Sequence, residues 1–361
     1  MSIVGRLYRT EQQFDFPALW KKALIASALI VVVSLGSLVF RGLNLGIEFE
    51  GGTSWEVIAP GASVAEARDA LAGTGAVAGK IQTVGADSIR VRADIDDAGG
   101  AAEVTQALAA LADVSIGEVS VTTVGPSWGD QITNKARNAL IWFFVIIAVY
   151  IAIRLEWRMS LGALVAVAHD IIISVGFYSV FQFEVTPATV IAFLTIMGYS
   201  LYDTIVVYDK VREIGRRLGP TERYTYTEMM NLALNQVLMR SINTSITSVL
   251  PVLSMLVVGS FFLGALTLQE FALALLIGII VGSYSSIFVA SAIVAWMKER
   301  EAQYAALARK VHLRSGGSEG TRMVASEDAA PGAARTRPTA DRVRPAHAPP
   351  RPRKKKKKKK R

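Results

Sequence analysis

Long apolar runs separated by short polar connections dominate the pattern along the chain. Six runs are long enough, or nearly so, to cross about 30 Å of hydrocarbon as helices. We place them at 22–41, 138–154, 160–181, 187–208, 239–262 and 266–296. The last run is longer than a span needs, so it is expected to tilt or to extend beyond the membrane. The pattern predicts a multi-pass α-helical membrane protein with six transmembrane helices.

Residues 42–137, between the first two runs, have the shorter periods of a small α+β domain. We expect strands at 53–58, 81–84, 88–93 and 114–124 and helices at 63–71 and 101–111. Ser63 and Glu66 have the spacing of a capping box. The order strand, helix, strand, strand, helix, strand matches the ferredoxin-like split βαβ unit, which many unrelated proteins share and which leaves function open.

Lysine and arginine collect on alternate connections. They precede the first span, fill the second connection and recur in 209–235, whereas the connections at 182–186 and 263–265 contain none. The positive-inside rule then places both termini in the cytoplasm, with 1–21 as the N-terminal segment and 209–235 as a partly helical cytoplasmic loop. The domain at 42–137 is extracytoplasmic. No small-x-small cleavage site follows the first run, so we interpret it as an uncleaved anchor.

Composition agrees with a membrane protein. The 361 residues are 52% hydrophobic, and the chain has no cysteine, so the outer domain must hold without disulfides. The net charge of +9 belongs to the tail, because residues 314–361 carry 16 basic and 4 acidic side chains. We expect 297–361 to be a cytoplasmic, basic and largely disordered tail. Anionic lipid, the ribosome or other RNA, and no dedicated partner at all remain open for it.

Two charged residues fall inside predicted spans. Asp203 lies in GYSLYDTIVVYDKVRE (198–213) and Arg240 in NQVLMRSINTSIT (235–247). A charge in hydrocarbon costs roughly 2.5–3.5 kcal/mol on the lenient insertion scale, so it persists mainly where it is paired or functional. Their depths can match, which suggests a proton relay, with Thr244 on the same helical face as Arg240. A structural role for Asp203 and an interfacial, snorkelling Arg240 are the alternatives.

Further polar and small residues lie within the spans. His169 and Asp170 are either a second relay or a satisfied contact between helices. Gly198 and Ser200, with Gly278 and Gly282, are expected to permit close helix packing. No nucleotide-binding loop, metal cluster or nucleophile arrangement appears in the sequence, so we expect no metal or other cofactor.

Several motifs resemble the SecF subunits of the bacterial SecD–SecF protein-export family, in the resistance-nodulation-division superfamily. The resemblance covers about residues 20–300. It rests on GLNLGIEFEGGT, VGPSWG, AHDIII, GYSLYDTIVVYDKVRE, LMRSINTSIT and IGIIVGSYSSIFVAS. The sequence departs from the usual motifs at Glu48, Tyr202, Lys210 and Ser241, where Asp, Asn, Arg and Thr are more common. None of these changes removes a relay group.

The resemblance implies a function. The chain would be a subunit in the bacterial cytoplasmic membrane that pairs with SecD as a heterodimer and uses the proton gradient to promote export of preproteins. This step would follow SecA-driven translocation through SecYEG, with YajC as a further partner. Asp203 would bind the proton, with Arg240 as its basic partner and Thr244 as an accessory hydroxyl. Half of a small-molecule or lipid exporter of the same superfamily, and a membrane scaffold without transport, are the competing interpretations.

Overall fold

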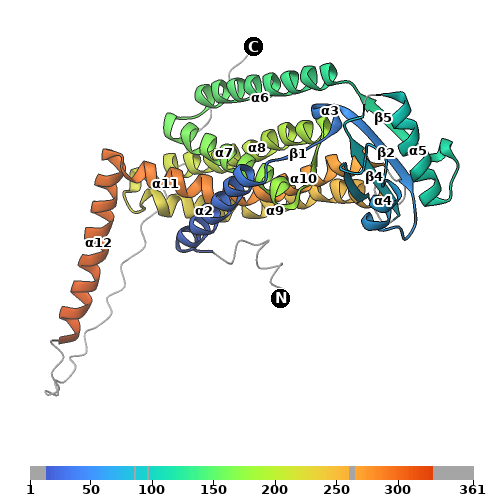
Figure 1. The fold of residues 1–361 in the computed structure, drawn as a ribbon. Coiled ribbons are helices and arrows are strands. Elements are labelled where there is room, and N and C mark those ends of the chain that lie inside the picture. Colours follow the sequence, from blue (N-terminus) through green and yellow to red (C-terminus); the bar gives the residue numbers. More distant parts are fainter. Residues whose placement is uncertain (1–13, 85–86, 96, 260–264, 328–361) are drawn as a thin grey trace, which may run out of the picture. The chain divides into compact units, whose positions relative to one another are not determined.

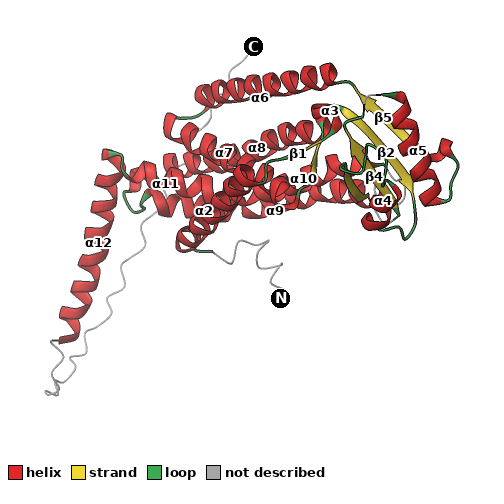
Figure 2. Cartoon of the chain, viewed as in Figure 1, coloured by secondary structure: helices red, strands yellow, loops and turns green. Residues whose placement is uncertain are grey.

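The computed structural model describes residues 14–84, 87–95, 97–259 and 265–327. Its contacts divide the chain into two units, Met1–Leu313 and Arg314–Arg361. The first unit contains a helical bundle and a small α/β domain (Figures 1 and 2). The predicted turn at 85–87 and the end of the predicted fifth span lie partly outside the described residues, as does most of the basic tail.

The small domain is a four-stranded sheet with two helices. Its elements are β2 (Gly52–Ile58), α4 (Val64–Ala70), β3 (Lys80–Val84), β4 (Ser88–Ala93), α5 (Ala98–Ala112) and β5 (Ser120–Val124). The strand order is β3-β4-β2-β5, and each neighbouring pair is antiparallel. Trp55, Val91 and Leu108 are fully buried between the sheet and the helices. The expected capping box of Ser63 and Glu66 is present at the start of α4.

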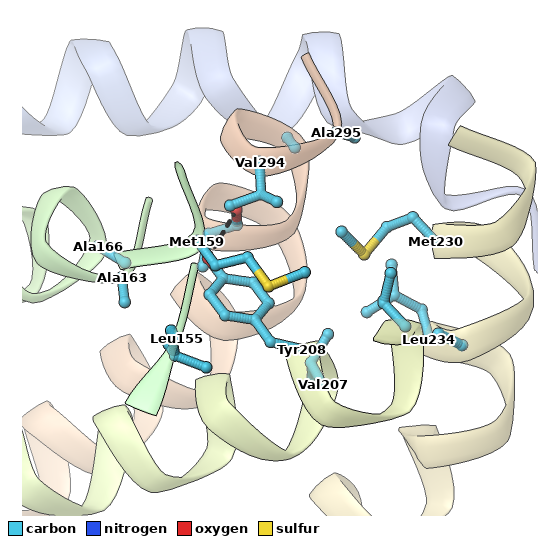
Figure 3. Packing of buried hydrophobic residues seen from close by; sticks show 14 of the residues in the cluster. Leu155, Met159, Ala163, Ala166, Val207, Tyr208, Met230, Leu234, Val294 and Ala295 are labelled. Carbon is cyan, nitrogen blue, oxygen red and sulfur yellow. Dashed lines mark hydrogen bonds between the residues drawn. The ribbon is translucent and has the colours of Figure 1, made fainter. Parts of the chain in front are cut away.

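The bundle is built from α2 (Phe16–Phe40), α6 (Pro126–Arg154), α7 (Trp157–Phe181), α8 (Pro187–Leu218), α9 (Tyr226–Val257) and α10 (Leu266–Ser285). A π-helical segment (Ser286–Ala290) joins α10 to α11 (Ser291–Glu299), and α12 (Ala302–Glu327) follows. In the main core cluster, Met159, Tyr208 and Met230 from three different helices converge (Figure 3). The Tyr208 hydroxyl donates a 3.1 Å hydrogen bond to the Ala290 carbonyl, which satisfies it inside this core.

Five helical segments are long and apolar enough to cross a membrane: Phe16–Phe40, Ser127–Arg154, Trp157–Phe181, Pro187–Thr221 and Thr267–Glu299. They correspond to five of the six predicted spans. The remaining predicted span, 239–262, overlaps α9, and its last three residues lie outside the described residues. In the described part of the chain α9 carries Arg240, Asn243 and Thr244 and is not among the five. Helix α6 has little contact with the rest of the chain. In its most apolar stretch, 6% of the residues are buried.

Several predicted boundaries were wrong. Helix α6 begins at Pro126, twelve residues before the predicted span, because Gly125 takes the N-cap position and proline is preorganised for the first turn. Helix α8 runs to Leu218, so the first part of the loop 209–235, which was predicted to be partly helical, continues this helix. The last predicted strand, 114–124, is interrupted by a 3₁₀ turn at Ile116–Glu118. The segment 297–361, predicted to be largely disordered, contains the last residues of α11 and the whole of α12, which starts in a segment rich in alanine and other helix-forming residues.

Two short strands connect the bundle to the small domain. β1 (Asn44–Leu45) pairs in parallel with β6 (Glu184–Val185), next to α3 (Ile47–Glu50). The chain then turns into β2 through Gly51 and Gly52, whose φ angles of 84° and 102° favour glycine. Residues 42–53 are therefore an ordered segment that fixes the sheet beside the end of α7 and the start of α8.

Glycines allow α8 and α10 to approach closely. A Cβ on Gly282 would lie 2.7 Å from Ser200 Cβ, and a Cβ on Gly278 would overlap Ile196. These contacts agree with the expected packing role of Gly278, Gly282 and Ser200. Gly198 differs, because nothing lies within 4 Å of its Cβ position. The prediction that Gly198 packs against another helix is not met within this chain, since that side of α8 is open.

We predict opposite effects of the same substitution at two of these glycines. Gly282→Ala should lower the free energy of unfolding by about 1–3 kcal/mol, because the added methyl group overpacks the α8–α10 contact. Gly198→Ala should raise it by up to about 1 kcal/mol through helix propensity alone. Unfolding of the purified chain in mixed micelles measures both. Equal effects at the two positions would contradict the packing described here.

Candidate functional site

Asp203 lies where α8 and α9 pack against each other. Its residue surface is 8% exposed. One carboxylate oxygen, Oδ1, accepts a 2.9 Å hydrogen bond from the Ser241 hydroxyl. The other, Oδ2, is buried and has no hydrogen-bond partner among the described residues. A buried carboxylate oxygen without a donor is costly, so Asp203 has a capacity for a proton or a further donor that this chain alone leaves unused.

Arg240 is placed differently from the prediction. Its side chain is exposed, and it donates a 3.0 Å hydrogen bond to the Tyr202 hydroxyl, with the guanidinium 6.0 Å from the centre of the tyrosine ring. No ion pair between Arg240 and Asp203 occurs in the described part of the chain. The expected direct pairing is therefore absent, because Arg240 extends to the residue next to Asp203. A guanidinium interacts favourably with both the hydroxyl and the ring of a tyrosine.

The hydroxyl that reaches Asp203 also differs from the prediction. Thr244 donates to the backbone carbonyls of Arg240 and Ser241 in its own helix, both at 3.0 Å. Ser241, one turn earlier, is 2% exposed and makes the contact with Asp203. The sequence places both hydroxyls near Arg240. The rotation of α9 against α8 decides which one meets the carboxylate.

Asp170 is the centre of a second buried polar cluster. Its Oδ2 accepts hydrogen bonds from Ser200 of α8 at 2.6 Å and Ser285 of α10 at 2.8 Å. Its Oδ1 lies 3.0 Å from His169 Nδ1. With three partners and 3% exposure, Asp170 joins α7, α8 and α10. Such an arrangement is expected if the His169–Asp170 pair is a satisfied contact between helices rather than a second relay. His169 Nε2, however, is buried without a hydrogen bond among the described residues.

Hydroxyl pairs extend this polar interior. Thr204 and Ser286 lie 2.9 Å apart, and Ser245 and Ser283 lie 2.7 Å apart. These contacts join α10 and its π-helical continuation to α8 and α9. Interhelical hydrogen bonds of this kind each stabilise a membrane bundle by about 0.6 kcal/mol on average. The polar interior therefore runs through the centre of the bundle, and Asp203 lies at its more open side.

An ion-pair cluster at the small domain was not predicted from the sequence. Arg90 Nη1 lies 2.9 Å from Glu184 and 3.3 Å from Glu270, and its Nε lies 3.4 Å from Glu56. Arg92 lies 3.0 Å from the same Glu184 and donates to the Leu45 carbonyl. Burial lowers the pKa of Arg90, but the carboxylates of Glu184, Glu56 and Glu270 raise it by more, so it stays above its ordinary value. The cluster attaches β4 to β6 and α10.

A sequence signal for this cluster exists. Arg90 and Arg92 alternate along one strand and therefore point to the same face of the sheet. Two arginines on one strand face predict an acidic counterpart, which the short connection containing Glu184 supplies. The counterpart is far away in the sequence, so its identity appears only in the folded chain.

We predict that Arg90→Gln loosens this attachment. Removing one partner of a buried ion-pair cluster leaves Glu184 and Glu270 incompletely neutralised, at a cost of about 3–5 kcal/mol. Hydrogen exchange should become faster in β1, β6 and the first turns of α10.

The matched control is Arg68→Gln, because the Arg68 side chain is exposed on α4 and donates to the Val77 carbonyl within the small domain. This variant should leave exchange in the same segments unchanged. Unchanged exchange in Arg90→Gln would mean that the ion pairs do not hold the small domain against the bundle.

The fold and the candidate site define a class: a polytopic membrane protein with buried acidic residues and a small α/β domain after its first helix. Two family models match the chain, Protein export membrane protein SecD/SecF, C-terminal, over residues 103–300, and the SecD/SecF GG Motif over residues 36–57. The first covers more than half of the chain. The protein belongs to the SecD/SecF family of protein-export membrane proteins.

Relatives and a solved structure agree with this assignment. The chain is 42% identical to a protein translocase subunit SecF of Streptomyces coelicolor, over 85% of this chain and 83% of the relative. It is 40% identical to SecF of Mycobacterium tuberculosis, over 83% and 70%. The crystal structure of SecDF from Thermus thermophilus matches with a TM-score of 0.73 at 33% identity, over 81% of this chain and 39% of that one. The chain thus corresponds to about two fifths of that longer protein.

Proposed function

We propose that this protein is the SecF-type subunit of a proton-driven preprotein export complex in the bacterial cytoplasmic membrane. Membership of the protein-export family supports the transport role, and Asp203 supports the coupling to protons. Asp203 is a buried carboxylate in a bundle helix, with one oxygen bonded to Ser241 and the other without a donor among the described residues. In this proposal no cofactor takes part. Moving one charge through 100 mV provides about 2.3 kcal/mol.

The contacts at Asp203 suggest how a proton changes the bundle. Asp203 and Ser241 belong to different helices, so their hydrogen bond is a contact between α8 and α9. The ionised carboxylate accepts from Ser241 and attracts the nearby Arg240. Protonation removes that attraction and turns one oxygen into a donor. The two helices then have two states of different energy, which a proton gradient can bias.

The open side of α8 and α9 is the proposed contact with SecD. Gly198 has no neighbour within 4 Å, and Tyr202 is 57% exposed although it lies inside a membrane-spanning segment. On α9, Arg240 and Leu250 are exposed in the same way. The Thermus relative is named SecDF and is more than twice as long as the matched region. A SecD subunit that packs on this side would bring new groups to Asp203 and complete its hydrogen bonding.

We also propose a membrane topology for the subunit. The proposed subunit has six transmembrane helices, with α9 as the fifth, a ferredoxin-like domain outside and both termini in the cytoplasm. It acts on preproteins after SecA has driven them through SecYEG, with YajC as a further component. In the proposed complex SecD covers the polar residues of α9, which is not among the five apolar segments found in the described residues. The SecF names of the relatives disfavour the small-molecule or lipid exporter.

Preprotein export into inverted membrane vesicles tests the function. In Asp203→Asn, the increment that depends on the proton gradient should disappear, while the ATP-driven component remains. The matched control is Asp209→Asn, two turns further along α8, where the carboxylate is 43% exposed and interacts with Arg154 and Arg212. This control should keep the full increment. Survival of the increment in Asp203→Asn would remove Asp203 from the relay and leave it a structural role.

A further inference from the structure

A second polar site lies at the opposite end of the bundle from the small domain. It is a cavity of about 230 Å³ between the ends of α7, α8, α9 and α11 and the start of α12. Its polar lining consists of Glu156, Arg212, Arg216, Tyr226, Lys298 and Tyr304. One water needs roughly 10–15 Å³ of such space, so the cavity has room for a larger polar group. None of these residues takes part in the relay around Asp203.

Two polar groups beneath the cavity have unused hydrogen-bonding capacity. The Tyr226 hydroxyl is buried, in a residue 4% exposed, and has no hydrogen-bond partner among the described residues. Burial raises the pKa of Tyr226 well above 10, so the hydroxyl keeps its proton at neutral pH. Lys298 is 3% exposed, and its ammonium pairs with Glu156 and with Glu301 at 3.3 Å. An ammonium has three donors, so one remains for a ligand.

The rim of the cavity is cationic. Arg216 is exposed, and within the described part of the chain its guanidinium makes no ion pair or side-chain hydrogen bond. Arg212 has a single long contact, 3.8 Å from Asp209. Glu156 is the opposing charge in the lining, and Lys298 neutralises it. The lining contains three cations and one carboxylate, while Glu301 and Asp209 outside the lining pair with Lys298 and Arg212. Arg216 is left without such a partner among the described residues, which favours a ligand with acceptor oxygens and negative charge.

The position of the cavity indicates where such a ligand comes from. Trp157, next to Glu156, is 67% exposed, and Trp296, two residues before Lys298, is 57% exposed. Exposed indoles at helix ends are typical of the headgroup level of a bilayer. Arg300 stacks on Trp296 at 3.7 Å, and Arg158 lies 5.1 Å from the Trp157 ring. The cavity thus opens at the level where lipid phosphates lie, beside an aromatic and basic belt.

We propose that this cavity binds a phosphate group, namely that of an acidic phospholipid in the adjacent leaflet. The guanidinium groups of Arg212 and Arg216 are suited to bind two phosphate oxygens, and the Tyr226 hydroxyl and Lys298 ammonium donate from below. Basic pockets between transmembrane helices bind lipid headgroups in this way. Arg212 and Arg216 belong to α8 and Tyr226 to α9, so the bound lipid connects the ends of the two helices that meet at Asp203.

The test measures lipid retention by the full-length protein. Nanodiscs contain either phosphatidylglycerol or phosphatidylcholine, and native mass spectrometry counts the lipids that remain bound. The wild-type chain should retain one phosphatidylglycerol in preference to phosphatidylcholine. Arg216→Gln and Tyr226→Phe should each weaken its apparent affinity by about tenfold, the loss expected from one strong donor. Arg217→Gln, the adjacent exposed arginine outside the cavity lining, should retain the lipid like the wild type.

Three outcomes would overturn the assignment. One is the absence of any preference for phosphatidylglycerol in the wild-type chain. Another is an equal loss in Arg216→Gln and Arg217→Gln, which would indicate general surface charge. The third is that inorganic phosphate stabilises the protein in phosphatidylcholine nanodiscs as strongly as phosphatidylglycerol does. That result would assign the cavity to a soluble anion. Arg216 is exposed, so its substitution keeps the test valid even if Tyr226→Phe impairs folding.

Discussion

Buried carboxylates in an apolar bundle are the constraint on which this structure depends, because each must find donors inside the protein. Asp170 finds three of them: Ser200, Ser285 and His169. Ser200 belongs to α8 and Ser285 to α10, whereas His169 is the neighbour of Asp170 in α7. Satisfying Asp170 therefore fixes α7, α8 and α10 relative to one another. The glycine contacts between α8 and α10 work in the same direction, since Gly282 brings Ser200 and Ser285 close to the same carboxylate.

Asp203 shows the opposite balance. It has one donor from the chain and one oxygen without a partner among the described residues, and it lies beside exposed Tyr202 and Arg240. A fully bonded carboxylate stabilises a fixed arrangement, whereas an incompletely bonded one can change its bonding when a proton or a neighbouring subunit arrives. The bundle therefore combines a fixed polar centre with an adjustable site at its open side. At the end of the bundle near the small domain, the cluster around Arg90 attaches that domain to β6 and α10 through ion pairs as well as through the connecting chain.

Periodicity and motifs predicted the larger part of the fold. The apolar runs located five helices. In the small domain, alternation located the strands and the Ser63–Glu66 capping box located the start of α4. Helix ends were less predictable, because Pro126 starts α6 within a polar segment that reads as a link. In the site, residue type identified Asp203 and Asp170. The hydrogen-bond and ion-pair partners were harder to predict. Whether Ser241 or Thr244 contacts Asp203 depends on the rotation of α9, and Arg90 and Glu184 are 94 residues apart in the sequence.

In the proposed function Asp203, and not Asp170, changes its protonation state. Infrared difference spectroscopy of the membrane-reconstituted protein across a pH titration tests it directly, because a protonated carboxyl group has its own carbonyl band. We expect a titrating carboxyl band that is lost in Asp203→Asn and persists in Asp170→Asn. A band that persists in Asp203→Asn and is lost in Asp170→Asn would contradict it and would move the proton site to the Asp170 cluster.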